Sequence, residues 1–219
     1  MFTLRYLPIL IGQYSIIPAV IIGIIRYRKI SGTYYPFVYF CWLGLLTELF
    51  SSVGIKVFHT NAAVSNIYVL FEFLLLLWQF RDWGVFRKTP DLYRLLLYGM
   101  PLAWVVDTLI IHSISEFNSL YRVLYSLVLV VMSINYLNTL FFEETRNILR
   151  NPRVLIILAW MIYFSFKVLT EIYFLFQFAK LKELFHWVLV GLDIVNLLAN
   201  FTFAVAMLWV PKKDNFLPR

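Results

Sequence analysis

Six ionisable side chains lie inside long apolar stretches of this chain: Glu48, Glu72, Asp107, Lys167, Glu171 and Asp193. A charged side chain at the centre of a membrane helix costs roughly 2.5–3.5 kcal/mol on insertion scales, so a chain that only had to sit in lipid would carry leucine there. The pattern predicts a polar site between helices. Because five carboxylates would face one ammonium, either several carboxyl groups stay protonated or a bound cation compensates them.

The composition predicts an integral membrane protein. Of the 219 residues, 62% are hydrophobic and only 14% are charged, and the apolar residues fall in runs of roughly 18–25, a length that spans a bilayer. The net charge is +7, but the basic residues lie between the apolar runs instead of on one dense face, so we expect no nucleic-acid binding. The single cysteine, Cys41, excludes an intrachain disulfide and a cysteine metal cluster.

The runs predict an all-α, single-domain bundle of seven membrane helices over residues 1–219. The spans cover about 7–25, 36–57, 64–80, 95–112, 121–142, 154–178 and 184–210. Of the 19 Lys and Arg residues, 13 fall on one side of this topology and 5, including Arg122, on the other, with Lys167 inside a span. Since cytoplasmic loops carry the excess of basic residues, we expect the N-terminus outside and the C-terminus in the cytoplasm.

Helical spacing indicates which polar residues of the last span share a face. His186, Asp193 and Asn200 are seven residues apart, and Asn196 lies on the same stripe. We expect this stripe to face inward, with Asn196 and Asn200 lining a path through the bundle.

The remaining charges predict where the site lies. Lys167 and Glu171 are four residues apart in the sixth span, so they predict an internal ion pair, with a carboxylate across the bundle as the alternative partner of Lys167. Glu48 and Glu72 lie near the middle of their spans, whereas Glu171 and Asp193 lie toward the predicted outer side. A pocket is therefore expected to open to the external face.

No recognisable catalytic motif is present, so we do not predict an enzyme. The three histidines lack the His-Glu-x-x-His spacing of a zinc site, and Gly-x-Ser-x-Gly is absent. Seven helices in this orientation resemble retinal proteins in layout only, because the last span contains no lysine that could hold the chromophore. We expect neither a metal nor a cofactor.

One segment of the third span resembles a known group of proteins. Asn66-x-Tyr68-x-x-x-Glu72-Phe73, followed by a leucine-rich run, is similar to the third helix of small, mostly uncharacterised seven-helix membrane proteins from Bacteroidota-type bacteria. The resemblance implies a bacterial inner membrane and brings no established activity. Asn66 is placed to cap the helix start, Tyr68 to anchor at the interface and Glu72 to lie buried one turn deeper.

The leading functional hypothesis is a small transporter or channel for a proton, a cation or a small polar solute. The carboxylates that would bind the cation are Glu48, Glu72, Glu171 and Asp193. Lys167 would supply the internal counter-charge beside them.

The alternative is a seven-helix sensor or receptor that signals to a cytoplasmic partner protein. Its docking surface would be the basic loop from Arg81 to Arg94, with Arg81, Trp83, Arg87 and Lys88 as contacts. Besides the lipid bilayer, a second copy of the chain is a further expected partner, and a structural subunit of a larger membrane complex is the remaining option.

Overall fold

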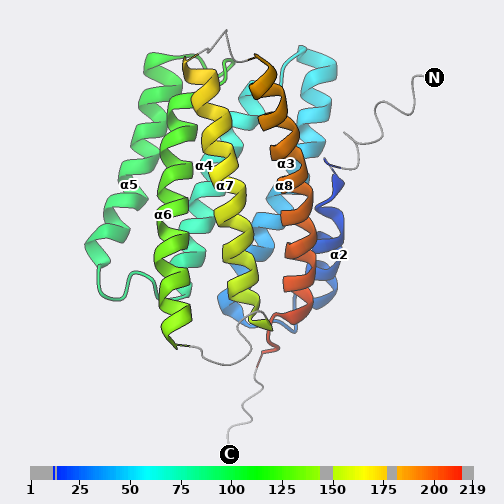
Figure 1. Ribbon diagram of the computed structural model, residues 1–219, viewed down its shortest axis with the longest axis vertical. Helices are drawn as coiled ribbons and strands as arrows, with labels where there is room; N and C mark the ends of the chain where they lie inside the picture. Colours follow the sequence, from blue (N-terminus) through cyan, green and yellow to red (C-terminus); the bar gives the residue numbers. More distant parts are fainter. Residues whose placement is uncertain (1–11, 13, 144–149, 177–181, 214–219) are drawn as a thin grey trace, which may run out of the picture.

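The computed structural model describes residues 12, 14–143, 150–176 and 182–213, and within these ranges it contains helices and no β-strand. The helices run side by side along one long axis (Figure 1). They are α2 (Ile17–Arg26), a 3-10 turn η1 (Gly32–Tyr34), α3 (Tyr35–Phe58), α4 (Ala62–Asp82), α5 (Pro90–Val105), a π-helical segment η2 (Val106–Ile111), α6 (Ser119–Glu143), α7 (Pro152–Phe176) and α8 (Lys182–Trp209). The predicted helical class is confirmed.

Six helices of the described chain are long and apolar enough to cross a membrane, by length and composition. They cover Gly32–Phe58, Ala62–Asp82, Pro90–Ile111, Ser119–Phe142, Pro152–Phe176 and His186–Trp209. Helix α2 is shorter, and the first predicted span begins among residues that lie outside the described part of the chain. The fold is therefore compatible with a multi-pass membrane protein, whereas the count of seven and the orientation stay predictions.

Prolines mark several helix starts, because a proline in the first turn lacks only an N–H that has no acceptor within the helix. At the other end of α3, His59 adopts the left-handed conformation with φ 58° and stops the helix. Helix α5 begins at Pro90, so the loop predicted over Arg81–Arg94 is reduced to residues 83–89. The prolines concerned are Pro18, Pro36, Pro90 and Pro152.

Aromatic side chains fill the half of the bundle near the C-terminal end of α8. Ring centroids lie 5.4 Å apart for Trp83 and Tyr136 and 5.6 Å apart for Phe40 and Phe203. Such pairs add to the stability that burial of the rings provides. The other rings of this aromatic cluster are Phe37, Phe80 and Trp160.

Two polar clamps close the same end of the bundle. The Gln79 side chain of α4 accepts a hydrogen bond from the Phe37 backbone N–H at 2.8 Å and donates one to the Thr33 carbonyl at 2.6 Å. Arg26 donates to carbonyl groups in and just after the last turn of α8, including that of Val210 at 2.8 Å. Both clamps satisfy backbone groups that helix ends leave without intrahelical partners.

The Gln79 clamp gives a prediction about stability. Gln79→Ala leaves the buried Phe37 N–H and the Thr33 carbonyl without these partners, and each unsatisfied buried group costs about 1–3 kcal/mol. We expect the free energy of unfolding in detergent micelles to fall by about 2 kcal/mol. Thr139→Ala, at an exposed position, is the control and is expected to change it by less than about 0.5 kcal/mol; equal effects of the two variants would contradict the clamp.

Candidate functional site

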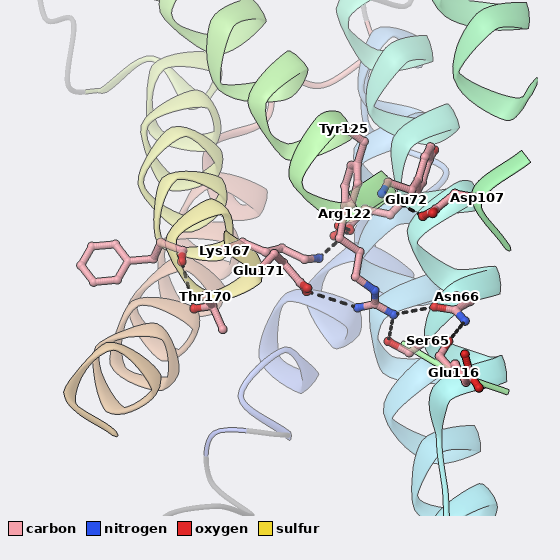
Figure 2. Close-up of polar contacts among 12 residues, drawn as sticks. Ser65, Asn66, Glu72, Asp107, Glu116, Arg122, Tyr125, Lys167, Thr170 and Glu171 are labelled. Atoms are coloured by element: carbon pink, nitrogen blue, oxygen red, sulfur yellow. Dashed lines mark hydrogen bonds and ion pairs between the residues drawn. The ribbon is translucent and has the colours of Figure 1, made fainter. Parts of the chain in front are cut away.

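A fully buried carboxylate, Glu72 of α4, lies at the centre of a cluster of polar side chains (Figure 2). This polar cluster consists of Tyr68, Glu72, Arg122, Tyr125, Lys167 and Glu171. Its Oε1 accepts a hydrogen bond from the Tyr68 hydroxyl at 2.7 Å. Its Oε2 accepts from the Tyr125 hydroxyl at 2.7 Å and from Lys167 Nζ at 3.2 Å. These three donors replace the hydration that a buried carboxylate loses.

The ammonium group of Lys167 is surrounded by aromatic rings as well as by Glu72. Its Nζ lies 5.1 Å from the ring centroid of Tyr125, 5.5 Å from that of Tyr163 and 5.8 Å from that of Tyr68. Ring faces attract a cation within about 6 Å, most strongly where water is excluded. The carboxylate of Glu72 and these rings together stabilise the charge of Lys167, a residue that is only 7% exposed.

The predicted Lys167–Glu171 ion pair is therefore wrong, and the alternative partner across the bundle is correct. Lys167 extends from α7 toward α4 and α6, because Glu72 there is 0% exposed and has no water to balance its charge. Glu171 instead lies beside Arg122, with Oε1 at 3.6 Å from Nη1 (Figure 2). Instead of one ion pair within α7, the structure has two ion pairs between helices, one joining α7 to α4 and one joining α7 to α6.

Sequence reasoning missed Arg122, which it counted as a charge of an external loop. The side chain is 6% exposed, and its Nη2 donates hydrogen bonds to Ser65 Oγ at 2.8 Å and to Asn66 Oδ1 at 3.0 Å. One feature of the sequence could have indicated its burial. Arg122 lies inside the predicted span 121–142, in the first turn of a helix that packs against other helices. Its Nε has no hydrogen-bond acceptor among the described residues.

Arg122 changes the predicted charge balance. Lys167 pairs with Glu72 and Arg122 pairs with Glu171, so the polar cluster is neutral, whereas five carboxylates around one ammonium would be negative.

Asp107 is not part of the polar cluster and lies where η2 meets the start of α6. There its Oδ2 accepts from the Tyr121 backbone N–H at 2.9 Å, at an otherwise unpaired helix start.

Asn66 connects the polar cluster to the segment between η2 and α6. Its Nδ2 donates to the carbonyl groups of Ile114 and Glu116, at 3.0 Å and 2.6 Å. Its own carbonyl accepts from Trp104 Nε1 at 2.8 Å. The predicted helix-capping role of Asn66 is wrong, since α4 already begins at Ala62.

Two cavities lie beside the polar cluster. The outer cavity, of about 560 Å³, is lined by Asn61 and Phe117 at the end of the bundle where α4 and α6 begin. The inner cavity, of about 100 Å³, is lined by Phe40 and Phe203 of the aromatic cluster. Both are lined by Thr47, Glu48, Tyr68 and Tyr163.

Sequence-predicted site residues are distributed over these two cavities. The outer cavity also holds Lys167 and Glu171, and the inner cavity holds Glu72, Asn196 and Asn200. Asn200 Nδ2 donates to Ser15 Oγ at 2.7 Å, which connects α8 to the residues just before α2. Four of the six predicted binding residues, those other than Glu171 and Asp193, line the inner cavity.

Glu48 differs from the other carboxylates of the site. It is half-buried, both cavities share it, and within the described chain its carboxylate has neither a hydrogen bond nor an ion pair. When ionised, Glu48 leaves one negative charge unbalanced in the cavity walls, since the polar cluster beside it is neutral. A carboxylate in this position attracts a positively charged species.

Asp193 lines neither cavity, so the structure does not bring it together with the other predicted site residues. It is exposed, as is His186, whereas Asn200 on the same stripe is buried. No residue of α8 between 186 and 198 is buried by the described chain. A shared helical face therefore does not give shared burial, because the neighbouring helices cover only the second half of α8.

The predicted docking surface is also altered. Arg81, Arg87 and Lys88 are exposed, but Trp83 is only 7% exposed. Its ring stacks on Tyr136 in the aromatic cluster, so Trp83 is not part of the exposed basic surface. The sensor hypothesis loses the one aromatic anchor it relied on.

Comparisons with protein families, curated proteins and solved structures find no match to this chain. The resemblance of the Asn66–Phe73 segment to seven-helix bacterial proteins therefore stays a prediction. The site has to be interpreted from its own geometry.

The buried Lys167–Glu72 pair gives a second prediction. Glu72→Gln leaves the ammonium of Lys167 buried without its carboxylate, and breaking such a pair on one side costs about 3–5 kcal/mol. We expect the free energy of unfolding in mixed micelles to fall by that amount. In the double variant Glu72→Gln/Lys167→Met the loss is expected to be well below the sum of the two single losses.

The matched control is an exposed pair of the same chain. Arg94 and Asp91 lie 3.1 Å apart at the surface, so Asp91→Asn is expected to cost about 0–1 kcal/mol. Additive losses in the buried double variant would show that Lys167 and Glu72 do not stabilise one another.

Proposed function

We propose that this chain is a multi-pass membrane transporter whose interhelical cavities take up a positively charged species: a proton, an inorganic cation or a small organic cation. The supporting observation is Glu48, a carboxylate in the walls of both cavities that has no partner among the residues the structure describes. Its charge is felt strongly there, because protein and lipid screen it less than water does.

The neutral polar cluster supports this assignment by elimination. Glu72 is saturated by three donors, and Glu171 already faces Arg122. A cation attracted to either would have to displace a buried partner, which is costly. Glu48 can accept a cation without such a displacement.

The two ends of the bundle differ in a way that favours a transporter over an open channel. The outer cavity reaches Asn61 and Phe117 at one end. Toward the other end, the inner cavity meets Phe40 and Phe203, which pack against Trp160 in the aromatic cluster. A species bound at Glu48 can therefore leave on the far side only after these rings move, as alternating access requires.

We further propose that the outer cavity opens to the outside of the cell. More basic residues flank the opposite end of the bundle than the end where the outer cavity lies. In the described chain, those at the opposite end include Arg28, Lys29, Arg87 and Lys88, all exposed. The burial of Arg122 removes one basic residue from the predicted external side and strengthens the asymmetry.

Transport can be tested by current measurements on proteoliposomes adsorbed to a solid-supported membrane. Rapid concentration jumps of H⁺, Na⁺, K⁺ or choline are expected to evoke a transient current with at least one of these cations. In Glu48→Gln the current should fall at least about tenfold, since the variant removes the carboxylate that has no partner among the described residues of the cavity walls.

The control is Asp193→Asn, which removes a carboxylate of the same chain outside both cavities and should leave the current unchanged. Currents equal to those of protein-free liposomes for all four cations, or equal currents in wild type and Glu48→Gln, would refute the proposal.

Orientation is tested separately by cysteine labelling. The single natural cysteine, Cys41, is fully buried, so Cys41→Ala provides a background for Ser115→Cys and Lys88→Cys, one in a loop at each end of the bundle. In intact cells a membrane-impermeant maleimide is expected to label position 115, and position 88 only after permeabilisation. The reverse pattern would invert the topology.

A further inference from the structure

We infer that the species bound at Glu48 is a small organic ammonium ion, held between this carboxylate and the rings of Tyr68 and Tyr163. The inference rests on the proposed function in one respect, namely that Glu48 faces a cation. It adds the chemical class of that cation.

The size of the cavities favours an organic ligand. The outer cavity of about 560 Å³ lies within the range of small-molecule sites, roughly 300–1,000 Å³. An inorganic cation would instead need a compact shell of oxygen ligands. The described residues contain no group of three or more His, Cys, Asp and Glu side chains that could hold a metal ion.

The aromatic lining favours an ammonium ion over other organic ligands. Tyr68 and Tyr163 line both cavities, next to Glu48, and Phe40 and Phe203 close the inner one. Alkylated ammonium ions are recognised where ring faces and a carboxylate surround them, because the rings supply attraction and the carboxylate supplies the counter-charge.

The chain already stabilises one ammonium group in this way. Lys167 Nζ lies 5.8 Å from the Tyr68 centroid and 5.5 Å from the Tyr163 centroid, and its counter-charge is Glu72. The two tyrosines thus attract the ammonium that Glu72 balances, and they line the same two cavities as Glu48. Glu48 therefore brings a second carboxylate to cavities that the same two rings line.

Other ligand classes fit the charges less well. An anion would have to compete with Glu72 for Lys167 and with Glu171 for Arg122. A neutral polar solute would leave the Glu48 charge unbalanced. A proton or an inorganic cation would also balance an ionised Glu48, but of these cations only a small organic one also fills a volume of this size.

The test compares two molecules of nearly the same shape on the purified full-length chain in detergent. Choline carries a quaternary ammonium group, and 3,3-dimethyl-1-butanol replaces its nitrogen by carbon and is neutral. By isothermal titration calorimetry, choline is expected to bind at least about tenfold more tightly than the neutral analogue, as a carboxylate–aromatic site requires. Glu48→Gln should remove most of this preference, and Asp193→Asn should keep it.

Two variants at Tyr163 distinguish the contribution of its ring to choline binding from that of its hydroxyl group. Tyr163→Phe keeps the ring and is expected to keep choline binding within about twofold, whereas Tyr163→Leu removes the ring face and should weaken binding roughly fivefold. Elution as a single detergent-solubilised species verifies that each variant folds. Equal affinity for choline and its neutral analogue, or undiminished choline binding in Glu48→Gln, would overturn the inference.

Failure of the inference is distinguishable from failure of the proposed function. If choline neither binds nor evokes current while H⁺ or Na⁺ does, the ammonium class is wrong and cation transport stands. If none of the cations evokes a current, the proposed function itself is wrong.

Discussion

Charge inside a hydrocarbon layer must be balanced within the protein, and the pairing of Glu72 with Lys167 is where this bundle meets that constraint most strictly. The pair joins α4 to α7, and the Tyr125 hydroxyl brings α6 to the same carboxylate. A second ion pair, between Arg122 of α6 and Glu171 of α7, lies one turn away along α7. Because each partner is nearly buried, removal of any one leaves a charge that neither water nor lipid can stabilise.

This constraint divides the bundle into two halves with different physical character. Rings such as Phe40 and Phe203 pack closely in the half near the end of α8, where the clamps of Gln79 and Arg26 satisfy backbone groups. The other half keeps its polar side chains and contains the outer cavity, whereas the inner cavity reaches Phe40 and Phe203 of the aromatic half. An aromatic half and a polar half with a cavity are compatible with the gated pathway that we propose.

The sequence predicted the helices well, since a bilayer dictates the length and hydropathy of every span. It also placed Glu72 and Lys167 in the interior, because central charges have no other stable position. It did not decide between the two partners offered for Lys167, Glu171 and a carboxylate across the bundle, since pairing depends on how neighbouring helices meet. For the same reason Arg122 was assigned to a loop. Asp193 was grouped with the other site residues for a related reason, because periodicity gives a face of α8 but not what covers it.

Two carboxylates of the same type, Glu72 and Glu48, line the inner cavity and differ in what surrounds them. Three donors hold Glu72, so exchange of any partner would leave a buried group unsatisfied. Glu48 has no such partners to lose, and its negative charge can be balanced by a ligand that arrives and departs. Transport needs binding that is favourable but reversible, so under the proposed function the carboxylate that stabilises the fold and the one that would bind the cation have to be different residues.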